Sequence, residues 1–143
     1  MRQISPHLLW IGSAADARDW RRLMQQGIAA VVDLAIEEAS ARPPHEMVYC
    51  RFPLVDGGDN PSSRMAGAVQ TVAMFLREGV PTLVACGAGM SRSPAVVAVA
   101  SALVNGLTPD ECLNRVAAHA PHDVSATFWR DLLAVYDQIR SRS

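Results

Sequence analysis

The stretch that decides the fold covers residues 83–93 and reads Leu-Val-Ala-Cys-Gly-Ala-Gly-Met-Ser-Arg-Ser. An apolar run over residues 81–85 follows a glycine and predicts a short buried strand. Pro94 then begins an Ala/Val-rich segment, and proline is favoured near the first position of a helix, where its missing N–H costs nothing. The sequence therefore predicts a tight strand-to-helix connection that contains Cys86 and Arg92.

A connection of this kind is suited to binding anions. Its backbone N–H groups turn inward, and the helix N-terminus adds partial positive charge. In this environment we expect the Cys86 thiol to have a lowered pKa and to react as a thiolate. The planar fork of Arg92 can bind two oxygens of a phosphoryl group. The sequence thus predicts a phosphate-binding loop, formed by Gly87, Ala88, Gly89, Met90, Ser91 and Arg92.

Strand and helix patterns alternate along the rest of the chain. Apolar runs predict strands over residues 7–11, 28–34, 47–54 and 81–85. Helical patterns and capping residues predict helices over residues 14–26, 62–78, 93–105 and 108–120, and a last helix from residue 125. We therefore expect one α/β domain over residues 1–143, with a mostly parallel central sheet of four to five strands flanked by helices.

The stretch over residues 83–93 resembles a sequence motif of a known protein family. Residues 86–93 are similar to the signature loop of the cysteine-dependent dual-specificity protein phosphatases, within the protein tyrosine phosphatase superfamily. Residues 4–13, 27–34 and 52–56 resemble other strands and turns of that family, so the likeness covers nearly the whole chain. One position departs from the pattern, because Ala85 stands where the family usually has histidine.

The chemistry of phosphate esters assigns roles to the residues in and near the loop. Cys86 is the expected nucleophile, Arg92 neutralises the phosphoryl oxygens, and Ser93 donates a hydrogen bond to the sulfur. Asp56 is the expected general acid, because it follows a strand in a Gly-rich loop and matches the family's acid, thirty residues before the cysteine. Asp59 is the alternative acid, although it can also cap and start the next helix.

Several other residues near the expected site keep two interpretations. Ser91 either bonds within the loop and fixes its shape, or faces solvent. Met90 is expected at the rim of the pocket. The segment that contains His119, His122 and Asp123 has mainly helix-end and turn character, and resemblance to the family places it near the pocket. Cys50 and Cys112 are expected in the core.

Composition excludes several other classes of protein. Half of the residues are apolar and 19% are charged, as in ordinary soluble domains, and the net charge of −1 predicts no general attraction to nucleic acid. The longest apolar run, over residues 95–104, is shorter than the roughly 20 residues that span a bilayer. Three widely spaced cysteines predict a reducing, cytoplasmic environment, and we expect no metal and no cofactor, since no Cys/His pair has ligand spacing.

These observations predict an enzyme that hydrolyses phosphomonoesters on protein side chains through a phosphocysteine intermediate. Its expected partner is a phosphorylated protein or peptide, and a phosphate or sulfate ion is expected to bind in the loop. The loop has no lysine, which favours a substrate with a single phosphate dianion. The alternatives are a phosphoinositide or small-molecule phosphatase, a low-activity module that binds phosphoproteins, and a sulfur transferase.

Overall fold

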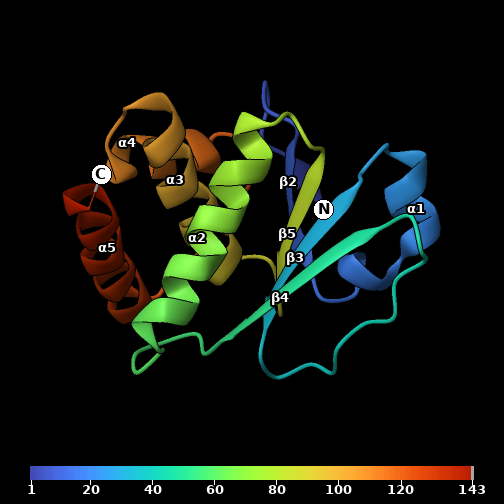
Figure 1. Ribbon diagram of the computed structural model, residues 1–143, viewed down its shortest axis with the longest axis horizontal. Helices are drawn as coiled ribbons and strands as arrows, with labels where there is room; N and C mark the ends of the chain where they lie inside the picture. The colour runs from blue at the N-terminus through green and yellow to red at the C-terminus, as the bar shows by residue number, and fades with distance from the viewer. Residues whose placement is uncertain (143) are drawn as a thin grey trace.

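The computed structural model describes residues 1–142 and has a five-stranded sheet between two layers of helices (Figure 1). The strand order is β1-β2-β5-β3-β4, and only β1 runs antiparallel to its neighbour. The strands are β1 (Arg2–Gln3), β2 (Leu9–Ser13), β3 (Ala30–Ala35), β4 (Val48–Leu54) and β5 (Thr82–Cys86). The prediction of an α/β fold with a mostly parallel sheet is confirmed.

The helices cover both faces of this sheet. The short 3₁₀ helix η1 (Asp16–Arg18) and α1 (Trp20–Gln25) lie on one face, and four helices lie on the other (Figure 1). Those four are α2 (Ser62–Arg77), α3 (Arg92–Asn105), α4 (Pro109–Ala117) and α5 (Ala126–Ser141). Their boundaries agree with the predicted ranges to within a few residues.

The prediction of one continuous helix over residues 14–26 is wrong, because this segment forms η1 and α1. The Ser13 hydroxyl accepts a hydrogen bond from the Asp16 N–H at 3.2 Å, but η1 begins after Ala15 without a side-chain cap. The Asp19 side chain accepts from the Arg22 N–H and caps α1. The cap at Asp19, six positions after Ser13, therefore starts a separate second helix within the segment.

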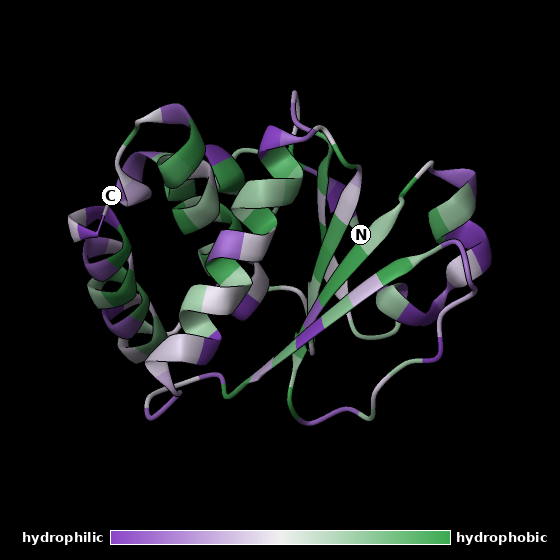
Figure 2. Ribbon diagram, viewed as in Figure 1, coloured by the Kyte–Doolittle hydropathy of each residue, from purple (hydrophilic) through white to green (hydrophobic). Residues whose placement is uncertain are grey.

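The hydrophobic core has two parts, one on each side of the sheet, and strand β5 contributes to both. Leu83 and Ala85 pack with the cluster on the α1 side, whereas Val84 and Cys86 pack with the cluster under α2–α5. Side chains that alternate between the two faces of a strand explain this division. Figure 2 shows the apolar colouring of the central strands that results from burial on both sides.

Helix α3 is the most deeply buried helix. Residues 92–102 are all buried, which explains why its sequence is apolar on every side rather than amphipathic. Its first residue is Arg92, which is only 5% exposed, and Ser93 is fully buried. Burial of α3 thus fixes both side chains directly after β5.

Three parallel strands carry reactive side chains to one edge of the sheet. Cys86 is the last residue of β5, Glu37 follows the end of β3, and Asp56 follows the end of β4. Strand β3 pairs in parallel with both β5 and β4, so the three strand ends lie side by side. Ligands of open α/β sheets bind at this carboxyl edge.

Candidate active site

The loop between β5 and α3 is held against β2. Cys86 is 2% exposed, and the Gly87 carbonyl accepts a hydrogen bond from the Ala14 N–H at 3.2 Å. Gly89 has φ of +75°, and a Cβ atom at this position would lie 2.8 Å from the carbonyl oxygen of Gly12. Only glycine satisfies both the backbone angle and the close contact. The two constraints set the path of the loop around the space above Cys86.

Gly89→Ala is expected to destabilise the protein by about 2–4 kcal/mol, because it combines a positive φ with a backbone clash. Gly27→Ala is the matched control, since Gly27 has φ of +76° and no atom near the added Cβ. We expect about 1–2 kcal/mol for that change. Urea denaturation measures both, and equal losses would contradict a role for the contact with Gly12.

Arg92 uses only part of its hydrogen-bonding capacity within the protein. Its Nη1 donates to Glu37 Oε1 and to the carbonyl of Leu54, both at 2.7 Å, and its Nη2 donates to Glu37 Oε2 at 2.6 Å. The buried Nε has no partner among residues 1–142. A guanidinium has five N–H groups. The edge formed by Nε and the second Nη2 hydrogen is therefore free to bind two oxygens of a ligand.

Glu37 is a site residue that the sequence interpretation missed. Its bidentate hydrogen bond with Arg92 lowers the pKa of Glu37 and raises that of Arg92. Two arginines fix the loop that carries it, because Arg51 donates to the carbonyl of Glu38 and Arg18 donates to the carbonyl of Ala39. The sequence could have indicated Glu37, because it is an acidic residue just beyond a predicted buried strand. The same pattern led to the prediction of Asp56.

The structure brings Asp56 to the loop between β5 and α3. Asp56 Oδ1 accepts a hydrogen bond from the Ser91 hydroxyl at 2.6 Å, and Ser91 Oγ accepts one from the Ser125 N–H at 3.0 Å. The suggestion that Asp59 caps the next helix is wrong, because α2 begins after Pro61 without a side-chain cap. The side chain of Asn60 instead closes the turn that contains Asp56, where its Oδ1 accepts from the N–H of Val55 and its Nδ2 donates to the carbonyl of Val55.

The remaining predicted residues surround the loop or lie away from it. Ser93 Oγ is buried and has no partner within residues 1–142. Met90 is 43% exposed, and its carbonyl accepts from the Asp123 N–H at 2.6 Å, so the 119–125 segment contacts the loop. Cys50 and Cys112 lie elsewhere in the core, where burial raises the pKa of both thiols and makes them poor nucleophiles.

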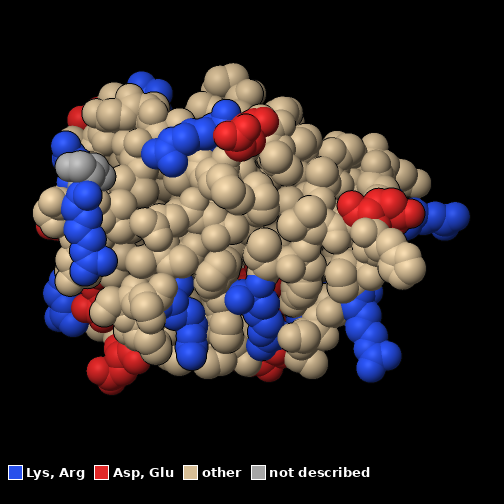
Figure 3. Space-filling model, viewed as in Figure 1, with Lys and Arg blue, Asp and Glu red and all other residues tan. Residues whose placement is uncertain are grey.

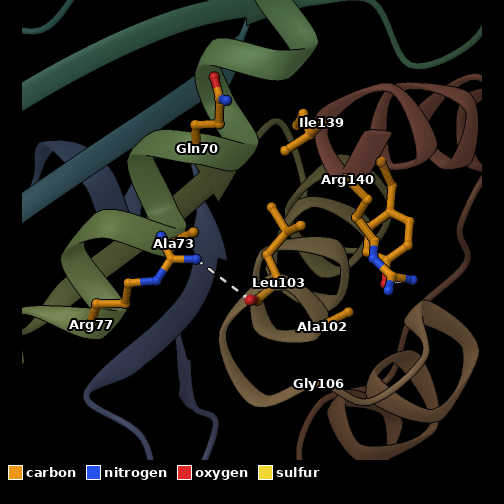
Figure 4. Close-up of a pocket in the computed structure, with 9 residues that line it drawn as sticks. Gln70, Ala73, Arg77, Ala102, Leu103, Gly106, Ile139 and Arg140 are labelled. Carbon is orange, nitrogen blue, oxygen red and sulfur yellow. Dashed lines mark hydrogen bonds between the residues drawn. The ribbon is translucent and has the colours of Figure 1, made fainter. Parts of the chain in front are cut away.

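The structure has one cavity beside the loop and a larger cavity elsewhere on the surface. Residues 88–90 line a cavity of about 170 Å³ beside β2. A cavity of about 500 Å³ lies between α2, α3 and α5, where Arg77 donates to the carbonyl of Leu103 at 3.4 Å and Arg140 packs over Tyr136 (Figure 4). None of the predicted site residues lines that larger cavity. The larger cavity therefore lies at the C-terminal end of α3, whereas the predicted site residues lie at its N-terminal end.

The surface charge is mixed. Basic and acidic side chains are interspersed over the face drawn in Figure 3. Over residues 1–142, no helix is long and apolar enough to cross a membrane. In the same range, no three His, Cys, Asp or Glu side chains are grouped as a metal ion would require.

Comparison with known proteins agrees with this geometry. The family model described as polymorphic toxin system, DSP-PTPase phosphatase matches residues 8–106. The chain therefore belongs to the DSP-PTPase family of phosphatases. Mouse dual specificity protein phosphatase 13B is 28% identical over 141 residues, which cover 92% of this chain and 71% of that protein.

Further relatives come from curated sequences and from solved structures. Human dual specificity protein phosphatase 26 is 29% identical over 138 residues, 92% of this chain and 65% of that protein, so the chain spans about two thirds of these relatives. The crystal structure of human DUSP28 matches with a TM-score of 0.82 at 22% identity, and the match covers 100% of both chains. A mouse putative dual specificity phosphatase matches at 0.81 with 24% identity, over 99% of this chain and 89% of that one. Both sequence relatives are named dual specificity protein phosphatases, and the two solved structures share the fold of this chain.

Proposed function

We propose that this protein hydrolyses phosphomonoesters on phosphotyrosine or phosphoserine/threonine side chains through a phosphocysteine at Cys86. The observation that carries the proposal is the unused edge of Arg92, a buried guanidinium whose Nε has no partner among residues 1–142, at the end of the loop that begins with Cys86. Leaving a buried donor unpaired is costly. Two phosphoryl oxygens would satisfy this edge while the phosphorus faces the sulfur.

The proposed reaction has two steps, and each uses named side chains of the site. The Cys86 sulfur attacks phosphorus, and the P–O bond to the substrate breaks as Asp56 gives its proton to the leaving oxygen. Asp56 then takes a proton from water, the water oxygen bonds to phosphorus, and the S–P bond breaks. The buried Ser93 hydroxyl, which has no other partner within residues 1–142, donates a hydrogen bond to the departing sulfur.

The proposal is tested by rapid acid quench of the enzyme with a ³²P-labelled phosphopeptide. We expect a labelled protein whose label is lost in Cys86→Ser. Faster turnover of a phosphoinositide or a small ester than of any phosphopeptide would favour the alternative substrates. Equal background hydrolysis by the wild-type protein and Cys86→Ser, with oxyanion binding in both, would favour a phosphoprotein-binding module. Thiosulfate cleavage would indicate sulfur transfer.

Glu37 is proposed to position Arg92 for the phosphoryl group. Glu37→Gln is expected to lower kcat/KM by about 10- to 100-fold, because small displacements of a binding group are costly in catalysis. The guanidinium would keep its bond to the carbonyl of Leu54 but lose the charged bidentate partner. Steady-state kinetics measures the change, and Glu38→Gln is the control, since Glu38 is the adjacent exposed acid and its backbone carbonyl accepts from Arg51. Equal kinetics in the two variants would exclude the positioning role.

The same pair gives the protein a pH-dependent stability. The pKa of Glu37 is lowered in the folded state from its ordinary value of 4.5, so the ionised carboxylate stabilises the fold above that value. This contribution is lost as the pH falls through the folded-state pKa. The stability difference between wild type and Glu37→Gln should therefore be full at neutral pH and shrink below about pH 4. Urea denaturation at both pH values measures it, and a constant difference would contradict the linkage.

A further inference from the structure

Three segments distant in the sequence meet at the hydroxyl group of Ser91. Ser91 is the last residue before α3 and is 8% exposed. The Ser125 N–H donates to its Oγ at 3.0 Å, and its hydroxyl donates to Asp56 Oδ1 at 2.6 Å. A hydroxyl group has a single hydrogen. The bond to Asp56 therefore uses the only donor of the Ser91 side chain.

The backbone around Ser125 keeps this hydroxyl in one orientation. Ser125 caps α5, where its own Oγ accepts from the Phe128 N–H at 3.4 Å, and its backbone N–H remains available for Ser91. Two residues earlier, the Asp123 N–H donates to the carbonyl of Met90 at 2.6 Å. Two backbone N–H groups of the segment thus donate hydrogen bonds to two successive residues of the loop, Met90 and Ser91.

We propose, on the basis of the function above, that Ser91 is the positioning residue for the general acid and that it directs the transferable proton to Oδ2 of Asp56. Oδ1 accepts the hydrogen of Ser91 both as a carboxylate oxygen and as the carbonyl oxygen of the protonated acid. The proton of the acid form consequently resides on Oδ2, the oxygen without a bond to the loop.

This arrangement changes the chemical step in a defined way. The Oδ2–H bond breaks, the proton passes to the ester oxygen, and that oxygen keeps the electron pair of the breaking P–O bond. The Ser91–Oδ1 hydrogen bond persists and becomes charge-assisted as Asp56 gains negative charge, so it is stronger after transfer than before. Ser91 therefore contributes only where proton transfer matters, which is with basic leaving groups.

Ser91→Ala is the direct test. We expect kcat to fall about 10- to 100-fold for a phosphate ester with a strongly basic alkoxide or phenolate leaving group. For an activated aryl phosphate, kcat should fall less than about 3-fold. Ser91→Thr, which keeps the hydroxyl, should restore most of the lost rate. The control is Ser101→Ala, because Ser101 is a similarly buried serine of α3 outside the site. Equal losses for both esters would overturn the proposal and leave Ser91 with a purely structural role.

A double-mutant cycle with Asp56→Asn separates positioning from loop integrity. If Ser91 acts through Asp56, Ser91→Ala should add less than about 2-fold to the loss in Asp56→Asn, whereas independent effects would multiply. Multiplicative losses would overturn the proposal. If Ser91→Ala does not fold, Ser91→Gly removes the same hydroxyl without adding atoms and replaces it in the cycle. Failure of the proposed function is distinguishable, because the wild-type protein would then form no phosphocysteine.

Discussion

Cys86→Ser is expected to lower kcat by on the order of 10⁴-fold or more while oxyanion binding is retained. A serine hydroxyl is a weak nucleophile at neutral pH unless an adjacent general base activates it. The amides of the loop and the free edge of Arg92 do not depend on the sulfur. Steady-state hydrolysis of an aryl phosphate gives the rate, and calorimetry with tungstate gives the binding.

The matched control for this variant is Cys50→Ser. It makes the same chemical change on strand β4, where Cys50 is half-buried and packs against the core. We expect Cys50→Ser to keep the wild-type rate. Turnover in Cys86→Ser within about 10-fold of the wild type would remove the covalent mechanism altogether.

Asp56→Asn is expected to slow hydrolysis by about 10²- to 10³-fold for esters with basic leaving groups and by less than about 10-fold for activated aryl esters. The amide keeps an oxygen that can accept from Ser91, so the turn should stay in place while the transferable proton is lost. A series of aryl phosphates with leaving groups of increasing basicity measures the effect. The rate should depend more steeply on leaving-group basicity in the variant than in the wild type.

Asp59→Asn is the control, since Asp59 lies in the same turn and was the alternative acid. Asparagine tolerates the positive φ of 66° at this position, so the backbone should be unaffected. We expect this variant to keep the wild-type dependence on the leaving group. A steeper dependence in Asp59→Asn than in Asp56→Asn would transfer the acid role to Asp59.

Packing around Ala85 disfavours histidine, the residue that the family usually has at this position. Resemblance to the family invites histidine at this position, next to the nucleophile. In the structure Ala85 is fully buried and packs with Trp10, Leu23 and Val31 on the α1 side of the sheet. A side chain as large as histidine would overpack this cluster, at a cost of about 1–3 kcal/mol. The face of the sheet on which the residue lies was not available from the strand pattern alone.

Local patterns determined most of the secondary structure. The nearly continuous apolar runs of β3 and β5 and the Pro-Asp-Glu start of α4 identified these elements, because burial on both faces and capping act within a few residues. The first helix was predicted incorrectly, since Ser13 and Asp19 are both good caps and the sequence does not show which one the chain uses. Boundaries depend on such competing local bonds.

The pairing of Cys86 with Arg92 was predictable from local sequence, because a spacing of six positions across one tight strand-to-helix turn brings the two residues together through chain connectivity. Only the tertiary structure decided which partners face them. Arg92 pairs with Glu37 from 55 positions away, and Ser91 pairs with Asp56 from 35 positions away. Those contacts exist because β5 and β4 both lie beside β3 in the sheet, an order that the local pattern of side chains does not encode.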